Sequence, residues 1–319
     1  MAAFFGFHMP NYTYPGIPDD RLFEHVIAQA RAAEAAGFDL VTVMDHIYQI
    51  RGVGPESAPM LEPYTALAGI ATQTSRVKLG TLVTGVTYRN PALLVKQVTT
   101  LDVISKGRAV FGIGAAWNQD EHAGYGFEFP PIARRMDRLD EAVTIAKLMF
   151  TEERPSFEGK FYRIDRALNV PRPIQKGGPK ILIGGGGEKR TLRILAKHGD
   201  IGHWFGGALD DLKRKMGVFK EHCAAVGRNP SDVMIILGVG LVLAENDATA
   251  KAIMDALPAE RRAMIRVVSS LDEAAEYLRP FLDAGFGGFT FNNPTLPTID
   301  AIGRAGELIR TLRGSSVPA

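Results

Sequence analysis

The chain has 319 residues, of which 46% are hydrophobic and 23% charged, and its formal net charge is +2. This is the composition of an ordinary globular protein, and the small net charge argues against nucleic acid or an anionic membrane as a partner. No apolar run reaches the roughly 20 residues of a membrane span. The single cysteine, Cys223, excludes an internal disulfide, so we expect a reducing, cytoplasmic setting.

Strand-like and helix-like patterns alternate along the whole chain. In the first helix, Asp19 and Asp20 form the start, Leu22 and Val26 lie on one face, and Gly37 ends it. The same reasoning predicts eight strands, at 4–8, 40–43, 77–83, 109–113, 180–183, 201–204, 233–243 and 288–291. It also predicts eight helices, at 19–36, 63–74, 91–104, 134–150, 189–198, 209–226, 271–284 and 299–312.

Alternating strands and helices indicate an α/β fold with a parallel sheet. Eight repeats favour closure into a (β/α)₈ TIM barrel over an open doubly wound sheet, which is the alternative. We expect one domain over residues 1–319, with insertions at about 118–133 and 154–178 on the carboxyl-terminal face. The second insertion follows a helix, so the opposite face is the other possibility. Within it, residues 157–162 predict a short hairpin around Glu158-Gly159.

In such barrels the active site forms at the carboxyl ends of the strands. The residues there are mostly neutral and contain no pairing of a nucleophile with a base, which is typical of a site whose cofactor supplies the reactivity. They are His8, Asp45-His46, Val83-Thr84, Gly114 to Asn118, Gly184 to Gly187, Trp204 and Asn292-Asn293.

The run Gly184-Gly185-Gly186-Gly187 follows a predicted strand and precedes a helix. Glycine lets the backbone approach a ligand closely, and amides at a helix amino terminus favour phosphate. Arg190 and Thr191 add donors in the first turn. We interpret the run as a phosphate-binding loop in preference to a tight turn, because four glycines exceed what a turn needs. Its spacing matches neither a P-loop nor the dinucleotide fingerprint.

Asp45-His46 follows the second strand. An imidazole beside a cofactor ring can donate a hydrogen bond or a proton, but Asp45 can equally well just orient His46 within a capped loop. The sequence leaves both readings open. A metal site is not expected, since neither His-x-His nor His-x-x-x-His spacing occurs.

Other polar and aromatic residues near the strand ends have weaker signals. Trp117 can form a wall against a flat ring and Asn118 can bond a ring carbonyl, although both can instead anchor their loop. The remaining candidates for substrate contacts are His8, Asn11, Tyr48 and Trp204, of which His8 is more often structural in such a position.

The segment Leu79 to Ala92, LGTLVTGVTYRNPA, resembles the third-strand signature of the luciferase-like flavin and deazaflavin oxidoreductases. The resemblance continues over nearly the whole chain, at Leu101 to Arg108, Gly112 to Trp117, Gly184 to Leu192 and Lys197 to Asp200. Asp45-His46 is similar to the pattern of the branch that binds the deazaflavin coenzyme F420.

This resemblance implies hydride transfer between coenzyme F420 and a small organic substrate in a barrel that is often a homodimer. It also implies a non-proline cis peptide at Leu82-Val83 behind the ring. Because Asp45-His46 follows the strand next to this segment, we predict that His46 acts at the reacting face and that Asp45 holds it. The implied coenzyme contacts are Leu82, Val83, Thr84, Ala115, Asn118, Gly184, Gly185, Gly186, Gly187, Arg190 and Thr191. An FMN-dependent monooxygenase and a non-catalytic flavin-binding barrel are the alternatives.

Two departures argue against oxidation of a sugar phosphate or a simple alcohol by the mechanism of that branch, and a third concerns the coenzyme phosphate. Ala115 stands where those dehydrogenases have an acidic residue, and Ile50 stands where the sugar-phosphate enzyme has a tryptophan. Ala208 falls near the lysine that binds coenzyme phosphate in that enzyme, so Arg190 and Thr191 are expected to substitute for it.

Overall fold

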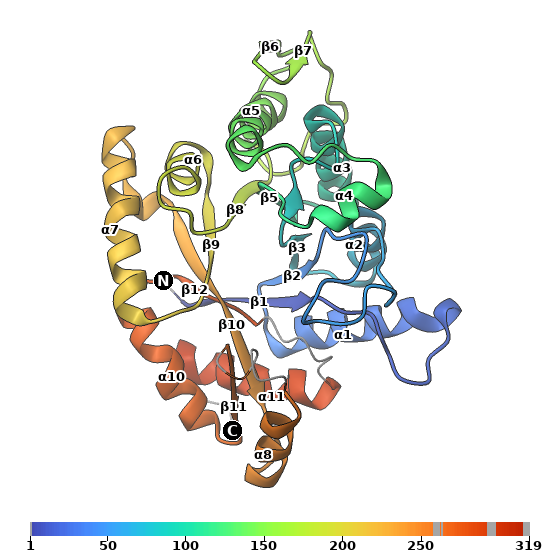
Figure 1. The fold of residues 1–319 in the computed structure, drawn as a ribbon, viewed down its shortest axis with the longest axis vertical. Coiled ribbons are helices and arrows are strands. Elements are labelled where there is room, and N and C mark those ends of the chain that lie inside the picture. The colour runs from blue at the N-terminus through green and yellow to red at the C-terminus, as the bar shows by residue number, and fades with distance from the viewer. Residues whose placement is uncertain (1, 258–261, 263, 292–297, 315–319) are drawn as a thin grey trace.

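The computed structural model describes residues 2–257, 262, 264–291 and 298–314. Eight parallel strands form a closed ring, because β12 pairs with both β10 and β1, and β9 pairs with β10 (Figure 1). This confirms the predicted TIM barrel. In ring order the strands are β1 (Phe4–Met9), β2 (Leu40–Val43), β3 (Lys78–Thr81), β5 (Ala109–Gly114), β8 (Lys180–Gly184), β9 (Ile201–Phe205), β10 (Met234–Leu243) and β12 (Gly288–Phe291).

The helices form the outer layer of the barrel, and local sequence signals set their ends (Figure 1). Proline occupies the first turn of the second and third helices, and a left-handed glycine, Gly37 at φ 90°, ends the first. They are α1 (Leu22–Ala36), α2 (Pro63–Gln73), α3 (Pro91–Ile104), α5 (Ile132–Thr151), α6 (Thr191–His198), α7 (Leu209–Ala225), α10 (Leu271–Asp283) and α11 (Ile299–Arg313). Short 3₁₀ turns lie at Asp19–Arg21 and Pro230–Asp232.

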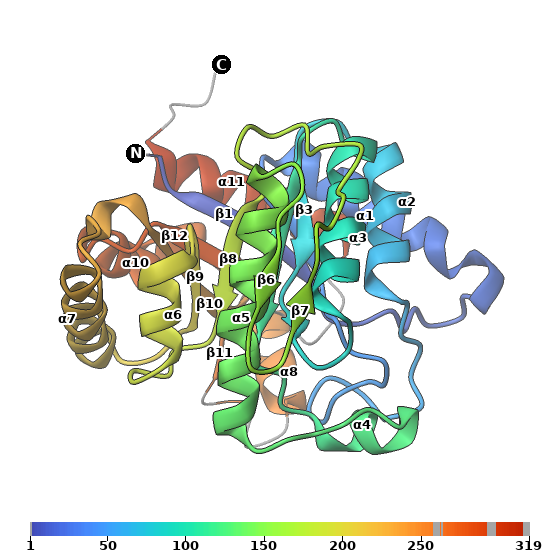
Figure 2. The same ribbon diagram turned by 90° about the horizontal axis from the view of Figure 1, so that it is seen from above.

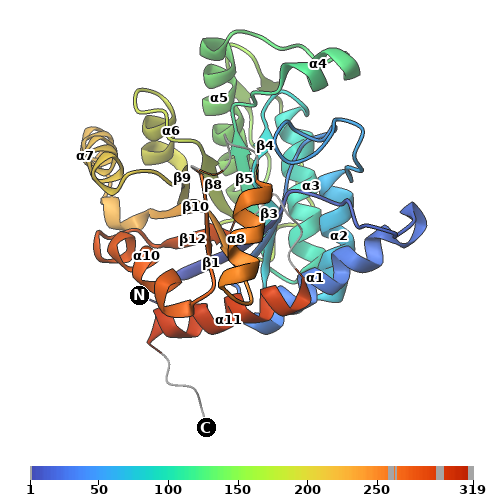
Figure 3. The same cartoon turned by 60° about the horizontal axis from the view of Figure 1, so that its bottom comes forward.

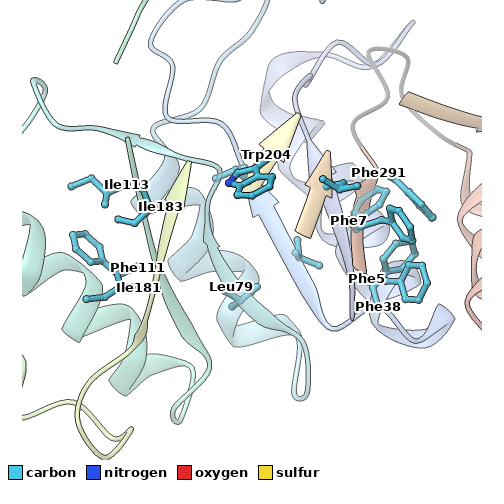
Figure 4. Packing of buried hydrophobic residues seen from close by; sticks show 14 of the residues in the cluster. Phe5, Phe7, Phe38, Leu79, Phe111, Ile113, Ile181, Ile183, Trp204 and Phe291 are labelled. Carbon is cyan, nitrogen blue, oxygen red and sulfur yellow. The ribbon is translucent and has the colours of Figure 1, made fainter. Parts of the chain in front are cut away.

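The buried apolar residues form two clusters because successive side chains of a strand point to opposite faces. A small cluster fills the barrel interior, from Leu40, Val110, Leu182, Ile201 and Ile236. A much larger cluster packs the outer face of the strands against the helices, and Figure 4 shows its members Phe111, Ile113, Ile183 and Trp204.

Besides the 3₁₀ turn at Pro230–Asp232, four short elements among the described residues were not predicted. They are β4 (Thr84–Gly85), α4 (Gln119–Tyr125) in the first insertion, α8 (Asp247–Ala256) and β11 (Ile265–Val268). Because of β11, the apolar run at 233–243 is not a single barrel strand over its whole length. Residues 234–239 belong to the barrel, whereas Gly240–Leu243 extend beyond it and pair with β11.

The second insertion follows α5 and precedes β8, so it leaves from the amino-terminal side of the barrel and not from the carboxyl-terminal face, where it was expected. Its hairpin folds back beside α5 and α3 (Figure 2). The two strands, β6 (Phe157–Glu158) and β7 (Arg163–Ile164), are antiparallel. The hairpin is therefore present, but its second strand begins after Tyr162. The carboxylate of Glu141 on α5 accepts three backbone N–H groups of the turn, from Lys160, Phe161 and Tyr162, and this holds the hairpin against the helix.

Candidate functional site

His46 lies in the loop after β2 and is held by Glu121 of α4. The Nδ1 atom of His46 lies 2.5 Å from Oε1 of Glu121, whose side chain is completely buried. The edge of the imidazole meets the indole of Trp117, with ring centroids 5.4 Å apart. This arrangement fixes the ring plane of His46 and occupies one of its two nitrogen atoms.

Glu121 is the centre of a small hydrogen-bond network. Besides the bond to His46, its carboxylate accepts the N–H of Ile47 at 3.0 Å, the Tyr88 hydroxyl at 2.8 Å and the Asn118 amide at 2.6 Å. Burial raises the pKa of Glu121, but the hydrogen bond and charge of His46 and the bonds from Ile47 and Tyr88 outweigh this, so that its pKa is lowered overall. Glu121 is therefore a buried carboxylate kept ionised by its donors.

Asp45 does not hold His46, contrary to the expectation from their adjacency. Arg89 donates to both carboxylate oxygens of Asp45, at 2.9 and 2.8 Å, and the N–H of Gly85 donates at 3.2 Å. Neighbouring side chains of an extended segment point to opposite sides, so the Asp45 carboxylate turns toward the start of α3 while His46 turns toward α4. Asp45 thus fixes the loop that follows the third strand.

The loop after β3 carries the expected cis peptide at Leu82-Val83. The half-buried Val83 lies against two glycines of neighbouring strands: a Cβ added to Gly114 or Gly184 would stand 2.8 or 2.7 Å from its side chain. The hydroxyl of Thr84 is buried and shares hydrogen bonds with Tyr64 and Thr81, at 2.7 and 2.8 Å. Thr84 is therefore committed to internal bonds, whereas Leu82 and Val83 present a partly exposed apolar surface.

The glycine run begins at the end of β8 and reaches α6 only at Thr191. Gly185 has φ 111°, and its N–H donates to the carbonyl of His203 at 2.9 Å. Within the part of the chain that the structure describes, the amides of Gly186 and Gly187 donate to no other residue. They are available to an anion.

Lys215 of α7 adds a cation to this loop. A Cβ at Gly186 would stand 2.8 Å from the Lys215 Nζ, and one at Gly187 would stand 3.0 Å from the Thr191 hydroxyl. Lys215 forms no ion pair with any described carboxylate. Its Nζ lies 5.9 Å from the centroid of the Trp204 ring, and its charge helps to lower the pKa of Glu188. Two free amides beside a half-buried ammonium that forms no direct ion pair fit a phosphate group.

Arg190 is not directed at the glycine loop. Its guanidinium forms an ion pair with Asp137 and donates to the carbonyl of Ala133 at 2.8 Å, both on α5. Its charge is therefore already compensated. Lys215 could not be found from the sequence because it lies 28 positions beyond Gly187, on the second helix after the loop, with no motif linking the two.

Two neutral histidines lie inside the barrel near its carboxyl end. Nδ1 of His8 lies 2.9 Å from the Thr42 hydroxyl, and Nε2 of His203 lies 2.8 Å from the Thr290 hydroxyl. Burial, with electrostatic contributions from His203 and His46, lowers the pKa of His8 to about 3, and burial lowers that of His203 to about 4. Both imidazoles are therefore uncharged at neutral pH.

Trp204 was expected to contact substrate, and this is wrong. It is completely buried on the outer face of β9, where it packs edge-on against Phe219 and Phe286. Figure 4 shows it in the outer cluster. Alternation along the strand places the preceding residue, His203, on the inner face instead.

The remaining predicted residues lie around the same end of the barrel. Trp117 is exposed, Ala115 is half-buried, and Asn118 caps α4 by accepting the N–H of Asp120 at 3.2 Å. Tyr48 lies over Gly124 of α4 and meets the ring of Tyr125. Asn11 accepts the N–H of Thr13 at 2.7 Å. Asn292-Asn293 lies outside the described residues.

Among the described residues, no group of three or more His, Cys, Asp or Glu side chains is placed to hold a metal ion. No described helix is long and apolar enough to cross a membrane.

Comparison with known proteins identifies the family. The luciferase-like monooxygenase model matches residues 3–288. The F420-dependent glucose-6-phosphate dehydrogenase of Nocardia farcinica is 30% identical over 293 residues, covering 82% of this chain and 85% of that protein. An F420-dependent secondary alcohol dehydrogenase, solved with an F420-acetone adduct, has a TM-score of 0.81 at 20% identity, covering 98% of this chain and 99% of that one. A long-chain alkane monooxygenase has a TM-score of 0.83 at 15% identity, covering 100% and 93%. The chain belongs to the luciferase-like monooxygenase family.

Proposed function

We propose that this protein is an oxidoreductase that transfers hydride between coenzyme F420 and a small organic substrate at the carboxyl end of the barrel. The observation that carries the proposal is the pairing of His46 with the buried Glu121 on the same face as the glycine loop and the neighbouring Lys215. The names of relatives such as the Nocardia farcinica enzyme support this coenzyme. When bound, the deazaflavin supplies a carbon centre that carries hydride.

The amides of Gly186 and Gly187 and the ammonium of Lys215 bind the coenzyme phosphate in this proposal. The absence of side chains at Gly184 to Gly187 lets the coenzyme approach the protein backbone at the end of β8 closely. Leu82 and Val83 give the ring an apolar surface to pack against, and Ala115 and Asn118 border it from the loop after β5. The hydroxyl of Thr191 adds one donor to the phosphate.

His46 accepts or donates the proton that accompanies hydride transfer. Glu121 occupies Nδ1, so Nε2 is the atom that faces the reaction. A buried carboxylate on Nδ1 fixes the tautomer and the orientation of an imidazole, as in other enzymes whose histidine acts as an acid or a base. Asp45 has an indirect role in this proposal, because its carboxylate holds Arg89 and the backbone of Gly85 in place. His8, Asn11, Tyr48 and Trp117 remain candidates for substrate contacts.

We also propose a homodimer in a reducing, cytoplasmic setting. Large apolar side chains are exposed along α3 and the second insertion packed beside it; they are Leu93, Ile104, Leu168, Val170 and Ile174. Such a strip is typical of an interface between subunits. Light scattering on the purified protein measures the subunit number, and a monomer at micromolar concentration would contradict this proposal.

Binding and turnover together test the function. The protein is titrated with F420 and, separately, with FMN, and binding is followed by quenching of coenzyme fluorescence. Oxidation of reduced F420 is then measured with enones, imines and nitroaromatics as acceptors. We expect F420 to bind more tightly than FMN and at least one acceptor class to be reduced. Tight FMN binding with oxygen consumption would instead identify a monooxygenase.

A further inference from the structure

A cavity of about 360 Å³ opens at the carboxyl end of β1 and β12, beneath α8 and α11. Figure 3 shows both helices on this side of the barrel. One wall is the part of β10 that extends beyond the barrel to pair with β11. The volume is within the range of small-molecule sites. Its walls are largely apolar, formed by Phe7, Phe38, Leu241, Leu243, Ile253, Phe291 and Ile302.

The polar groups of this cavity are few and select against anions. Arg304 lines it, but its guanidinium is held by the backbone carbonyls of Ala244 and Ser269. The exposed carboxylates of Glu245 and Asp300 lie at the rim. An anionic ligand would meet these two negative charges and, among the described lining residues, no uncommitted cation.

His8 connects the cavity to the barrel mouth. Its Nδ1 is bonded to Thr42, which leaves Nε2 without a partner among the residues that the structure describes. The side chain lines the cavity, and it is close enough to His46 for the two imidazoles to interact electrostatically. A neutral imidazole can give or take one hydrogen bond, so a ligand in the cavity can bond His8 with an end that faces the reacting site.

We propose that this cavity binds the hydrocarbon part of a neutral, mainly apolar carbonyl substrate, whose oxygen lies toward His8 and His46. The inference rests on the proposed function and names its substrate class. A sugar phosphate, the substrate in the names of several relatives, does not fit, because its dianion would have to lie beside Glu245 and Asp300 in an apolar chamber.

Binding of the neutral fluorescent probe N-phenyl-1-naphthylamine to the coenzyme-free protein tests the cavity directly. Ile253→Glu places a charge in the wall and is expected to weaken probe binding about tenfold or more. Thr249→Trp fills the same wall without adding charge and is expected to do likewise. Ile299→Glu is the matched control, since Ile299 is half-exposed on α11 and does not line the cavity. 2-Decanone should displace the probe, and glucose 6-phosphate should not.

Probe binding that is equally strong in wild type, Ile253→Glu and Thr249→Trp overturns the proposal, as does displacement by glucose 6-phosphate. In turnover assays with reduced F420, KM for 2-alkenones should fall with chain length in the wild type, and this trend should disappear in Ile253→Glu while the F420 Kd is unchanged. If F420 does not bind at all, the proposed function and the substrate role of the cavity are both wrong, although the probe would still bind the cavity. The two failures are therefore distinguishable.

Discussion

At the scale of single residues, the sequence predicted which residues lie at the site better than it predicted the side chains to which they are hydrogen-bonded. His46 stands at the strand end where it was expected, but the groups that hold His46 and Asp45 lie 75 and 44 positions away, at Glu121 and Arg89. No local pattern encodes such long-range pairs. Trp204 shows the other limit. Successive residues of a strand face opposite sides of the sheet, so the last residue of the predicted strand faces outward and the preceding His203 faces the barrel interior.

Replacement of Glu121 should reveal that it acts through His46. We expect His46→Ala to lower kcat about 10²-fold, the usual scale for acid–base catalysis, with a smaller change in the coenzyme Kd. Glu121→Gln should lower kcat about tenfold and alter its pH profile, because the buried charge that orients His46 is lost.

The double variant distinguishes positioning from general damage. If Glu121 works through the imidazole, His46→Ala with Glu121→Gln should be no slower than His46→Ala alone. Tyr88→Phe removes another bond to the same carboxylate and is the control, expected to stay within a few-fold of wild type. Losses in the double variant that multiply would show that Glu121 has a merely structural role.

At the scale of elements, the eight strands and the main helices were predictable because each repeat has its own local signals. Proline in the first turn and glycine after the last turn delimit several of them. The missed elements are short and lie outside the repeat. The helix α8 has a clear cap, since Asn246 accepts the N–H of Thr249 at 2.9 Å, but the continuous apolar run before it hid the change of partner from β12 to β11.

The position of α7 beside the glycine loop predicts a phosphate-binding residue, Lys215, that the loop sequence did not indicate. Lys215→Ala should weaken coenzyme binding by about 1.5–3 kcal/mol, the range for a charge-assisted bond, and reduce its dependence on salt. Arg190→Ala should leave Kd within a few-fold, because its guanidinium is already paired on α5. Lys213→Ala, an exposed lysine of the same helix, is the control. Fluorescence titration at two salt concentrations measures all three, and a larger loss for Arg190→Ala than for Lys215→Ala would restore Arg190 to the phosphate site.

At the scale of the whole molecule, the barrel has an apolar interior whose carboxyl end is lined by neutral polar groups. The inner cluster fills the lower part, and His8, His203 and their threonine partners form the layer above it. Alternation along the strands dictates this layering, so the closed fold and its polar end follow from the pattern of strands. The identity of the groups that face one another across the barrel depends on closure, which places His203 of β9 against Thr290 of β12 although the two are 87 positions apart.

This layer makes the stability of the whole barrel sensitive to acid. Burial lowers the pKa of His8 to about 3 and that of His203 to about 4, whereas in the unfolded chain both return to about 6.5. Below pH 6.5 the unfolded chain therefore binds protons that the folded chain does not. The free energy of unfolding should be highest above this pH, fall as the pH decreases toward 4, and level off below the folded-state values. At pH 5 each histidine accounts for a loss of about 2 kcal/mol.

Urea unfolding between pH 8 and pH 4.5 measures this loss, with His203→Gln as the variant, since glutamine can bond Thr290 but does not titrate. The difference in unfolding free energy between pH 8 and pH 5 should be smaller in His203→Gln than in wild type by about 2 kcal/mol. Above pH 7.5 neither imidazole titrates in either state, so the two curves should run parallel there. This region separates the constant effect of the substitution on packing from the proton-linked effect. If both proteins lose the same unfolding free energy between pH 8 and pH 5, His203 is protonated at pH 5 in the folded barrel as in the unfolded chain. The polar layer would then be charged at that pH.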